Sequence, residues 1–398
     1  MAFGASAANA GITIPAGDWT IDIGGNVNTF YQHTKLSGDL SSPGVEDKIN
    51  DVSTGLLPSA LGVGGKTRQN DLDIAFQFTF FTGGNSGTQS AAGNNTLNIR
   101  QAFMTFGDAS WGTIKLGRDL GIFGSDAILS DMTLLGVGVG QNYNLESSTL
   151  GRIGSGYIYA DWIGQISYAS PNWNGFSFAV GLREPWTNGA AGHDRNDMGF
   201  EGKVAYEWAG DVAGKVWAGF VSQKHDGADS PATQVFDLDP ASPTFGTVVA
   251  VLASQFDSYT SRGWELGGKV GFGGLNLVGY YYNGKGLDSQ SILNNSFLGG
   301  LQFLGGQETD DDGGYVQATY VLPGVGTKLG ASYGISRSES DVSGGFDLEN
   351  KSWIIGAYHP LTKSLNLVAE YTHQKLEDDD TNFDGKAKTL SLGAILFF

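Results

Sequence analysis

Hydrophobic and polar side chains alternate one by one along most of the chain. Between Thr389 and Phe398, every second position is apolar, while the positions between them begin with small or polar side chains. The same alternation recurs in DWTIDIGGNVNTFYQ, GFSFAVGLR, GFEGKVAYEW, RGWELGGKVGF, TKLGASYGIS and SLNLVAEYTHQ. Because successive side chains of a strand point to opposite faces of a sheet, this period of two predicts β-strands with one apolar and one polar face.

The alternating segments number about sixteen, and short and long connections join them in turn. This arrangement is typical of an up-and-down meander of antiparallel strands. The predicted strands span 19–33, 54–64, 71–82, 96–107, 111–118, 161–170, 175–184, 197–208, 212–224, 262–272, 274–285, 313–322, 325–337, 351–359, 363–376 and 387–398. The predicted long connections span 34–53, 83–95, 119–160, 185–197, 225–261, 286–312, 339–350 and 377–386.

So many strands cannot share one filled core, because a barrel of this size leaves an open lumen. A transmembrane β-barrel, apolar outside and polar inside, suits the pattern, and its closure leaves no backbone group unpaired in lipid. The composition agrees, with 62 Gly, 12% aromatic and only 16% charged residues, and with no apolar run long enough for a transmembrane helix. We predict an all-β fold in which residues 19–398 form one antiparallel barrel.

Residues 1–18 are expected to form an N-terminal extension. The triplet Ala8-Asn9-Ala10 has the shape of a signal-peptidase site, although no positively charged segment precedes it. An export-signal remnant and a flexible extension both remain open.

Charge and motif content exclude several classes of function. The formal net charge of −18 argues against nucleic acid as a partner. The absence of Cys excludes disulfides and thiolate metal sites. The five histidines form no HExxH pair, and no GxSxG elbow is present, so we predict that the protein is not an enzyme.

The stretch RQAFMTFGDASWGTIKLGRD (100–119) resembles the general diffusion porins of Gram-negative outer membranes. Further stretches that resemble the family follow in its order, namely SALGVGG (59–65), SDAILSDM (125–132), ISYASPNWNGFSFAVGL (166–182) and the terminal Phe398. The resemblance implies a homotrimer of sixteen-stranded barrels in the outer membrane, each with its third loop folded inward. It also implies contact with outer-membrane lipid and lipopolysaccharide, and recognition of Phe398 by the barrel assembly machinery.

The resemblance further implies a pore constriction in which acidic loop residues face basic wall residues. Arg100 matches a basic wall position and Asp131 an acidic loop position, and a field between them would set ion preference. Other family charges fall on Ala60, Ala160 and Leu135, so fewer charges are expected here. The alternative is that these are ordinary solvated lumen charges. The predicted constriction set is Arg100, Lys115, Arg118, Asp119, Asp126, Asp131 and Asn26.

The segment EDDDTNFDG (377–385) carries acidic side chains at a spacing loosely similar to that of calcium loops. It lacks the glutamate that closes such a site, so a solvated outer loop is the alternative. The candidate surface ligands for Ca²⁺ or Mg²⁺ are Asp378, Asp380, Asn382 and Asp384. No other cofactor is expected.

These features predict a channel for passive diffusion of ions and small hydrophilic solutes. The net charge and the missing wall arginines favour a mild preference for cations. The first alternative is a porin selective for sugars, amino acids or carboxylates, in which the aromatic run Tyr280–Tyr282 could guide sugars. The second is an adhesin or structural barrel, for which acidic outer loops are the only indication.

Overall fold

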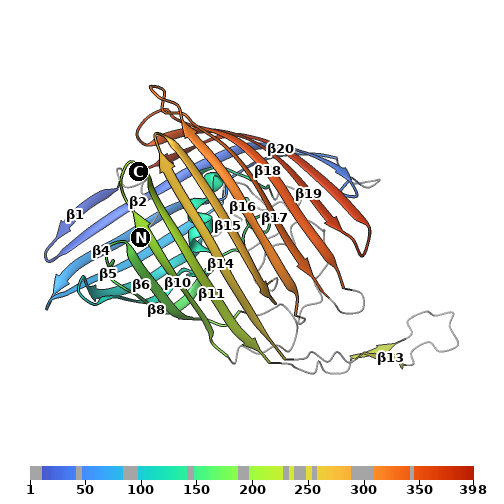
Figure 1. The fold of residues 1–398 in the computed structure, drawn as a ribbon, viewed down its shortest axis with the longest axis horizontal. Helices are drawn as coiled ribbons and strands as arrows, with labels where there is room; N and C mark the ends of the chain where they lie inside the picture. Colours follow the sequence, from blue (N-terminus) through green and yellow to red (C-terminus); the bar gives the residue numbers. More distant parts are fainter. Residues whose placement is uncertain are drawn as a thin grey trace.

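The computed structural model describes residues 11–41, 47–83, 97–140, 148–186, 197–226, 233–236, 248–252, 258–287, 308–340 and 345–398. Within these ranges the chain is almost entirely β-sheet (Figure 1). No helix of the described ranges is long and apolar enough to cross a membrane.

One sheet of 18 strands contains the barrel. Two of its strands, β1 (Ile12–Ala16) and β3 (Lys48–Ser53), are short additions along the edges of β2. The other sixteen are β2 (Trp19–Gly38), β4 (Ser59–Gln69), β5 (Leu72–Thr82), β6 (Asn98–Asp108), β7 (Gly112–Leu120), β8 (Trp162–Ala169), β9 (Phe176–Arg183), β10 (Gly199–Trp208), β11 (Ala213–His225), β14 (Tyr259–Phe272), β15 (Leu275–Lys285), β16 (Asp310–Val321), β17 (Lys328–Glu339), β18 (Asp347–Pro360), β19 (Leu365–Asp378) and β20 (Phe383–Phe397).

Each of the sixteen strands pairs antiparallel with the next, and β20 pairs back with β2 from Asn26↔Phe397 to Gly38↔Gly385. The predicted antiparallel barrel of about sixteen strands is therefore confirmed. Several strands extend further toward the long-loop end than predicted; β14 begins at Tyr259 and β18 at Asp347. A separate two-stranded sheet, β12 (Thr233–Phe236) with β13 (Val248–Leu252), lies within a connection predicted to be a loop.

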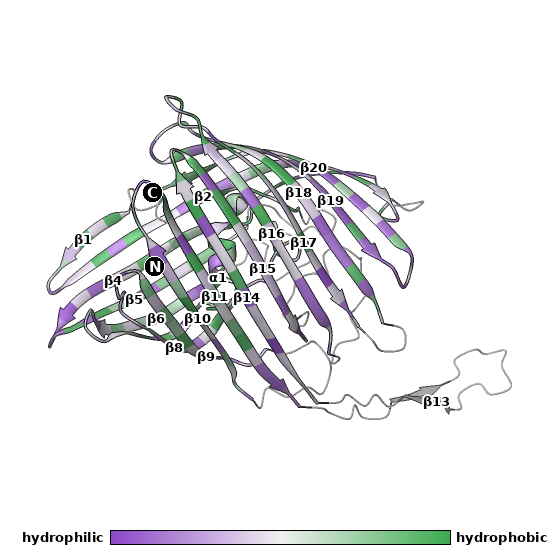
Figure 2. Cartoon of the chain, in the orientation of Figure 1, coloured by the Kyte–Doolittle hydropathy of each residue, from purple (hydrophilic) through white to green (hydrophobic). Residues whose placement is uncertain are grey.

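The alternation of side chains places apolar residues outside and polar residues inside. On β20, Leu390 and Leu392 are 42% and 46% exposed, whereas Thr389 and Ser391, which alternate with them, are buried. The hydropathy of the barrel strands alternates in the same way (Figure 2). An apolar outer surface on a closed barrel is suited to lipid, because lipid accepts apolar side chains at no cost.

The seam of the barrel is closed by main-chain hydrogen bonds from the last residue. Phe398 donates its N–H to the Gly25 carbonyl at 3.1 Å and accepts the Gly25 N–H at 2.9 Å. Beyond this point β1 continues along the same edge of β2, through Ile12↔Ile23 to Ala16↔Trp19. The sheet thus begins before the predicted boundary at residue 19, because the first hairpin fills the edge that β20 leaves open.

The second predicted strand, 54–64, is wrong in its boundaries. The structure has β3 and β4 on either side of residues 54–58, which do not pair with β2. Asn28 accepts the Gly55 N–H at 2.9 Å and donates to the Leu57 carbonyl at 2.8 Å, and Asn26 donates to the Pro58 carbonyl. The hydrogen bonds from these side chains take the place of main-chain hydrogen bonds between the strands. Pro58 has no N–H with which to form such a bond.

Candidate functional site

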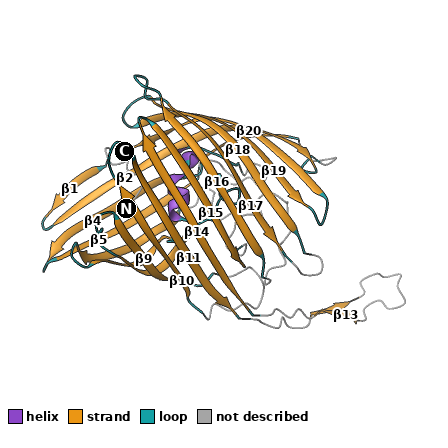
Figure 3. Cartoon of the chain, in the orientation of Figure 1, coloured by secondary structure: helices purple, strands orange, loops and turns teal. Residues whose placement is uncertain are grey.

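The connection between β7 and β8 folds into the barrel. It carries α1 (Ser125–Ser130) and the 3-10 helix η1 (Met132–Leu135), which lie within the ring of strands (Figure 3). Phe123 and Ile128 belong to a buried cluster that also contains wall side chains such as Trp217. We call residues 121–140 and 148–161 the inner loop. Its position confirms the predicted inward-folded third loop.

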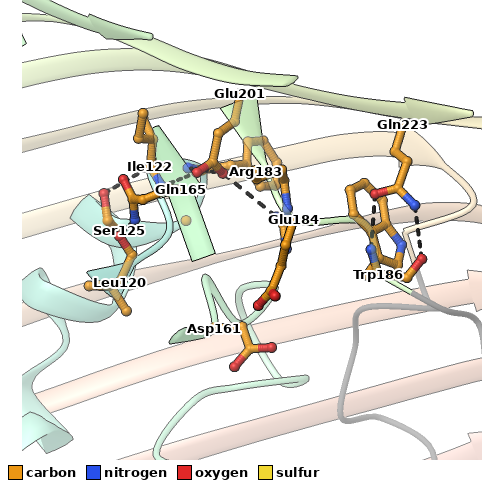
Figure 4. Close-up of polar contacts among 12 residues, drawn as sticks. Leu120, Ile122, Ser125, Asp161, Gln165, Arg183, Glu184, Trp186, Glu201 and Gln223 are labelled. Carbon is orange, nitrogen blue, oxygen red and sulfur yellow. Dashed lines mark hydrogen bonds and ion pairs between the residues drawn. The ribbon is translucent and has the colours of Figure 1, made fainter. Parts of the chain in front are cut away.

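The stem of the inner loop is held by a buried ion pair on the wall (Figure 4). Glu201 on β10 accepts the backbone N–H groups of Ile122 at 2.8 Å and Phe123 at 3.2 Å. Arg183 on β9 lies 3.6 Å from the same carboxylate, and its guanidinium stacks over the Trp186 ring. Because both charges are buried, each depends on the other, and the loop stem depends on both.

Helix α1 is held by charges from the next strands. Asp126 accepts hydrogen bonds from Lys203 on β10 at 2.7 Å and from Lys215 on β11. The backbone N–H of Gly124 donates to Glu265 on β14 at 3.0 Å. The carboxylate of Asp126 is buried, so this predicted constriction residue faces the wall.

Asp131 caps the 3-10 helix. Its carboxylate accepts the Thr133 N–H at 2.9 Å, the Thr133 hydroxyl and the Tyr157 hydroxyl at 2.9 Å. The adjacent Met132 N–H donates to Gln317 on β16 at 2.7 Å. Asp131 is only 5% exposed, and both its oxygens are occupied inside the loop. The structure therefore gives it a role in shaping the loop, and does not place it facing Arg100.

The tip of the inner loop meets Glu370 on β19. This carboxylate accepts the N–H groups of Val137 at 3.0 Å and Gly138 at 2.7 Å, and the Tyr358 hydroxyl at 2.7 Å. A Cβ added at Gly136 would lie 1.9 Å from Glu370 Oε1, so any larger residue there would have to displace this carboxylate from its hydrogen bonds. The tip is thus bonded directly to the wall.

The opposite side of the tip is held by residues 54–58. Leu56 donates its N–H to the Gly136 carbonyl at 2.9 Å, and Thr149 donates its N–H to the Gly55 carbonyl at 3.2 Å. The interruption between β3 and β4 therefore positions the tip as well. The sequence pattern suggested no such contact, because the residues involved are far apart in the chain.

The returning limb carries a buried arginine that sequence reasoning missed. Arg152 is fully buried and donates to Ser332 on β17 at 2.9 and 2.6 Å and to Ser352 on β18 at 3.1 Å. Nearby, Asn350 donates to the Gly154 carbonyl at 2.7 Å. The glycine-rich context of Arg152 resembles an ordinary loop, so only the folded structure reveals its partners.

The predicted wall residues on β6 and β7 form a second group. Arg100 lies at a bulge between β5 and β6, with its guanidinium 5.0 Å from the centre of the buried Phe81 ring. Lys115 and Asp119 form an ion pair, and Gln101 donates to Asp119 at 2.8 Å. These side chains share the inner face of the wall, so Arg100, Lys115 and Asp119 are placed where a lumen-lining role requires.

Arg118 lies on the other face. It pairs with Ala102 on β6 and with Gly164 on β8, and its strand neighbour Leu116 pairs with the exposed Met104 and Ile166. Directly opposite residues of adjacent strands project on the same side of a sheet. Arg118 therefore projects outward, which corrects its predicted place in the constriction. Asn26 also does not line the lumen freely, because it is buried at the split strand.

In each charged pair of the site, the basic side chain is more exposed than the acidic one. Side-chain exposure is 25% for Lys115 against 9% for Asp119, and 22% for Lys203 and 17% for Lys215 against 7% for Asp126. The carboxylates lie beneath the ammonium groups. The acidic side of the predicted constriction is therefore covered in the described part of the inner loop.

The side chains of the predicted surface cation site do not point toward a common position in the described residues. Asp378 accepts the N–H groups of Asp347 and Asp380, while Asp384 pairs with Lys375 and Lys386. Asn382 adopts a positive φ of 55° in the turn. No group of three or more acidic or histidine side chains in the described ranges is arranged to hold a metal ion. Ca²⁺ or Mg²⁺ binding at Asp378, Asp380, Asn382 and Asp384 stays a prediction.

Comparison with known proteins places this architecture in a family. A family model described as Gram-negative porin matches residues 1–379. No curated protein sequence matches the chain.

Several solved structures share the fold at low sequence identity. The outer membrane channel DcaP of Acinetobacter baumannii is 15% identical with a TM-score of 0.65, covering 98% of this chain and 100% of that one. The anion-selective porin from Comamonas acidovorans is 17% identical with a TM-score of 0.62, covering 96% and 100%. The trimer form of OmpT from Vibrio cholerae is 17% identical with a TM-score of 0.59, covering 96% and 99%.

The closed barrel with its apolar outer face, the inward loop and the family match agree. They place the chain in the outer membrane of a Gram-negative bacterium, and the family and fold point to a channel, not an enzyme. The protein belongs to the Gram-negative porin family.

Proposed function

We propose that the protein is a channel for passive diffusion of ions and small hydrophilic solutes across the outer membrane. The observation that carries the proposal is an inner loop bonded to the wall at its stem, helix, tip and returning limb. Glu201, Asp126, Glu370 and Arg152 each make one of these attachments. A loop fixed at all these points narrows the lumen by a constant amount. Diffusion through such a channel requires no energy source and no moving part.

The proposed ion preference is a mild one for cations, arising at the outer mouth. In the inner loop, Asp126 is covered and balanced by Lys203 and Lys215, and Asp131 is buried. The acidic segments 308–312 and 377–380 lie at the long-loop ends of the strands. Basic side chains pair with Glu308, Asp310, Asp312 and Glu377, whereas Asp378, Asp379 and Asp380 form no ion pair within the described residues. A negative mouth raises the local concentration of cations, and salt screens this effect with a Debye length of about 10 Å at 0.1 M.

A sugar track along the aromatic run of β15 receives no support. Tyr280 and Tyr282 are buried, and the Tyr280 hydroxyl donates to Glu265 at 2.8 Å. Tyr281 projects outward and is 43% exposed. None of the three rings is therefore presented to a passing solute, and unselective diffusion is the simpler proposal.

We also propose that the channel is a homotrimer without enzymatic activity. The fold shared with the trimer form of OmpT supports the trimer, and the family match supports a channel. Mass measurement of the folded protein in detergent, by light scattering with detergent correction, should give three chains per particle. A particle of one chain would contradict the trimer while leaving the channel proposal intact.

Two measurements test the channel proposal. Liposomes containing the protein should swell in sugars at rates that fall smoothly with solute mass, without saturation. Reversal potentials in KCl gradients should show K⁺ preferred over Cl⁻ at low salt, with the preference fading near 1 M as the mouth charges are screened. Saturation by one solute class would favour a substrate-selective channel instead. Preference for Cl⁻ at low salt would refute the proposed origin of selectivity.

A further inference from the structure

The inner loop presents an apolar surface to the lumen. Between residues 121 and 140 all but four residues are buried, and these four are Leu129, Ser130, Leu134 and Leu135. Leu129, on α1, is 46% exposed. The other large apolar side chains of the described residues with as much exposed surface lie on outer strand faces, next to strand ends or in turns. Leu129 is instead exposed inside the barrel, because α1 lies within the ring of strands (Figure 3).

No charged group of this stretch of the loop accompanies the leucines at the lumen. Its two acidic residues are buried, Asp126 beneath two lysines and Asp131 in hydrogen bonds within the loop. Leu135 occupies a position at which the family resemblance implied a charge. Water beside apolar side chains is released at a gain in free energy when a solute covers them with apolar surface of its own.

The wall across the lumen from the loop is mostly polar. The loop is bonded to the inner faces of β10, β11, β14, β16 and β19, which leaves β5, β6 and β7 on the opposite side of the ring. Thr105 lies directly opposite the inward Lys115, and Gln77 lies opposite Phe103, the next inward position of β6. The Lys115 ammonium lies over the Phe103 ring, 5.0 Å from its centre. The narrowed lumen therefore has an apolar face on the loop and a polar face on the wall.

We propose that the narrowed lumen favours small zwitterions with an apolar side chain, such as apolar amino acids, over polar solutes of the same mass. This inference rests on the proposed diffusion channel and specifies which solutes pass it most readily. Such a zwitterion turns its side chain toward Leu129, Leu134 and Leu135, while its ammonium and carboxylate groups stay hydrated beside the polar wall. A wholly polar solute loses water on the leucine side and receives no hydrogen bond in return.

The expected preference is modest. Apolar contact over about 30–40 Å² changes an equilibrium by a factor of roughly three to five. The leucines line the part of the lumen that the loop narrows, so the contact lowers the free energy of the solute where its passage is slowest. A lower barrier raises the rate of permeation by the same factor.

Leucine and asparagine are matched probes, because both are zwitterions without net charge and have nearly equal masses. Their initial uptake is measured with labelled amino acids in liposomes that contain the full-length folded protein, after subtraction of uptake by protein-free liposomes. Leucine should enter roughly three to five times faster than asparagine. A lumen without an apolar face would admit both at about the same rate.

Substitutions at the two leucines that are not part of a buried cluster test the assignment. Leu134 is left unchanged, because it packs against the buried cluster beneath the loop. Leu129→Gln/Leu135→Gln should bring the ratio of leucine to asparagine uptake close to one. Leu129→Met/Leu135→Met is the matched control, because it keeps an apolar side chain of similar volume at both positions and should keep the preference. Hydrogen–deuterium exchange at Val137 and Gly138 shows whether the loop tip stays bonded to the wall in each variant.

Equal uptake of leucine and asparagine by the unaltered protein would overturn the inference, and so would a preference for leucine that persists in the glutamine variant. If the double variant does not fold, Leu129→Gln alone should roughly halve the ratio, because Leu129 is the most exposed of the three leucines. Arabinose in the same liposomes separates this inference from the channel proposal. Entry of arabinose together with equal entry of the two amino acids refutes the apolar preference alone, whereas exclusion of all three solutes refutes the channel.

Discussion

The attachment of the loop tip can be tested by removing one carboxylate. Glu370 is 2% exposed and accepts three hydrogen bonds, from Val137, Gly138 and Tyr358. A hydrogen bond to a charged group contributes about 1.5–3 kcal/mol. Glu370→Ala should therefore lower the local stability of the loop tip by roughly 4–9 kcal/mol. The barrel ladder does not use this side chain, so the loss should be confined to the tip.

Hydrogen–deuterium exchange of the peptide that contains Val137 and Gly138 is the direct assay. Even the lower figure, about 4 kcal/mol, corresponds to roughly a thousandfold faster exchange of these two amides. Tyr358→Phe removes one of the three bonds and should accelerate exchange about tenfold. Glu207→Ala, at an exposed position on β10, is the matched control and should change nothing. Unchanged exchange in Glu370→Ala would refute the view that this carboxylate fixes the tip.

Other substitutions test the remaining assignments. Arg100→Gln should raise the permeability ratio of K⁺ to Cl⁻ severalfold, as measured by reversal potentials in planar bilayers. Asp131→Asn should leave this ratio unchanged. It should instead lower the stability of the inner loop by about 1–3 kcal/mol, as measured by urea unfolding. Gly55→Ala should increase current noise, because its Cβ would lie 2.0 Å from the Gly136 carbonyl; quiet currents would contradict the second attachment of the tip. Burial and nearby loop aspartates raise the pKa of Asp347, which lies beyond the apolar band. The folded protein therefore gains stability as the pH falls from neutral toward that pKa, and Asp347→Asn should raise the melting temperature at pH 7 and flatten its pH dependence.

Much of the fold could be predicted because the alternation of apolar and polar residues in a membrane-barrel strand shows which face meets the lipid and which meets the lumen. Leu390 and Leu392 alternate with Thr389 and Ser391 in the sequence, and the same alternation separates lipid from lumen in the structure. The same rule places Arg118 on the face opposite Lys115. The family resemblance suggested a pore position for it, and the alternation was the better guide.

The site was harder to predict because its contacts join distant parts of the chain. Asp126 meets Lys203 and Lys215 across 77 and 89 residues, so nothing near it in the sequence shows that the carboxylate is covered. Arg152 is held by serines 180 and 200 residues away. Alternation carries no information about a loop, whose contacts depend on which wall it reaches.

The split between β3 and β4 was missed for a different reason. Asn26 and Asn28 occupy inward positions of a regular strand pattern, and only their side-chain bonds to residues 54–58 interrupt the neighbouring strand. Side-chain competition with a ladder has no periodic signature. The interruption matters for the site because it reaches the loop tip.

The central claim is that the barrel is open and the inner loop stays in place within it. Recording of single insertions into a planar bilayer in KCl tests this most directly. The account predicts ohmic current in three equal steps for each insertion, with little open-state noise over the range of applied voltage. Insertions without conductance, or currents that close at small voltages because the loop moves, would contradict it.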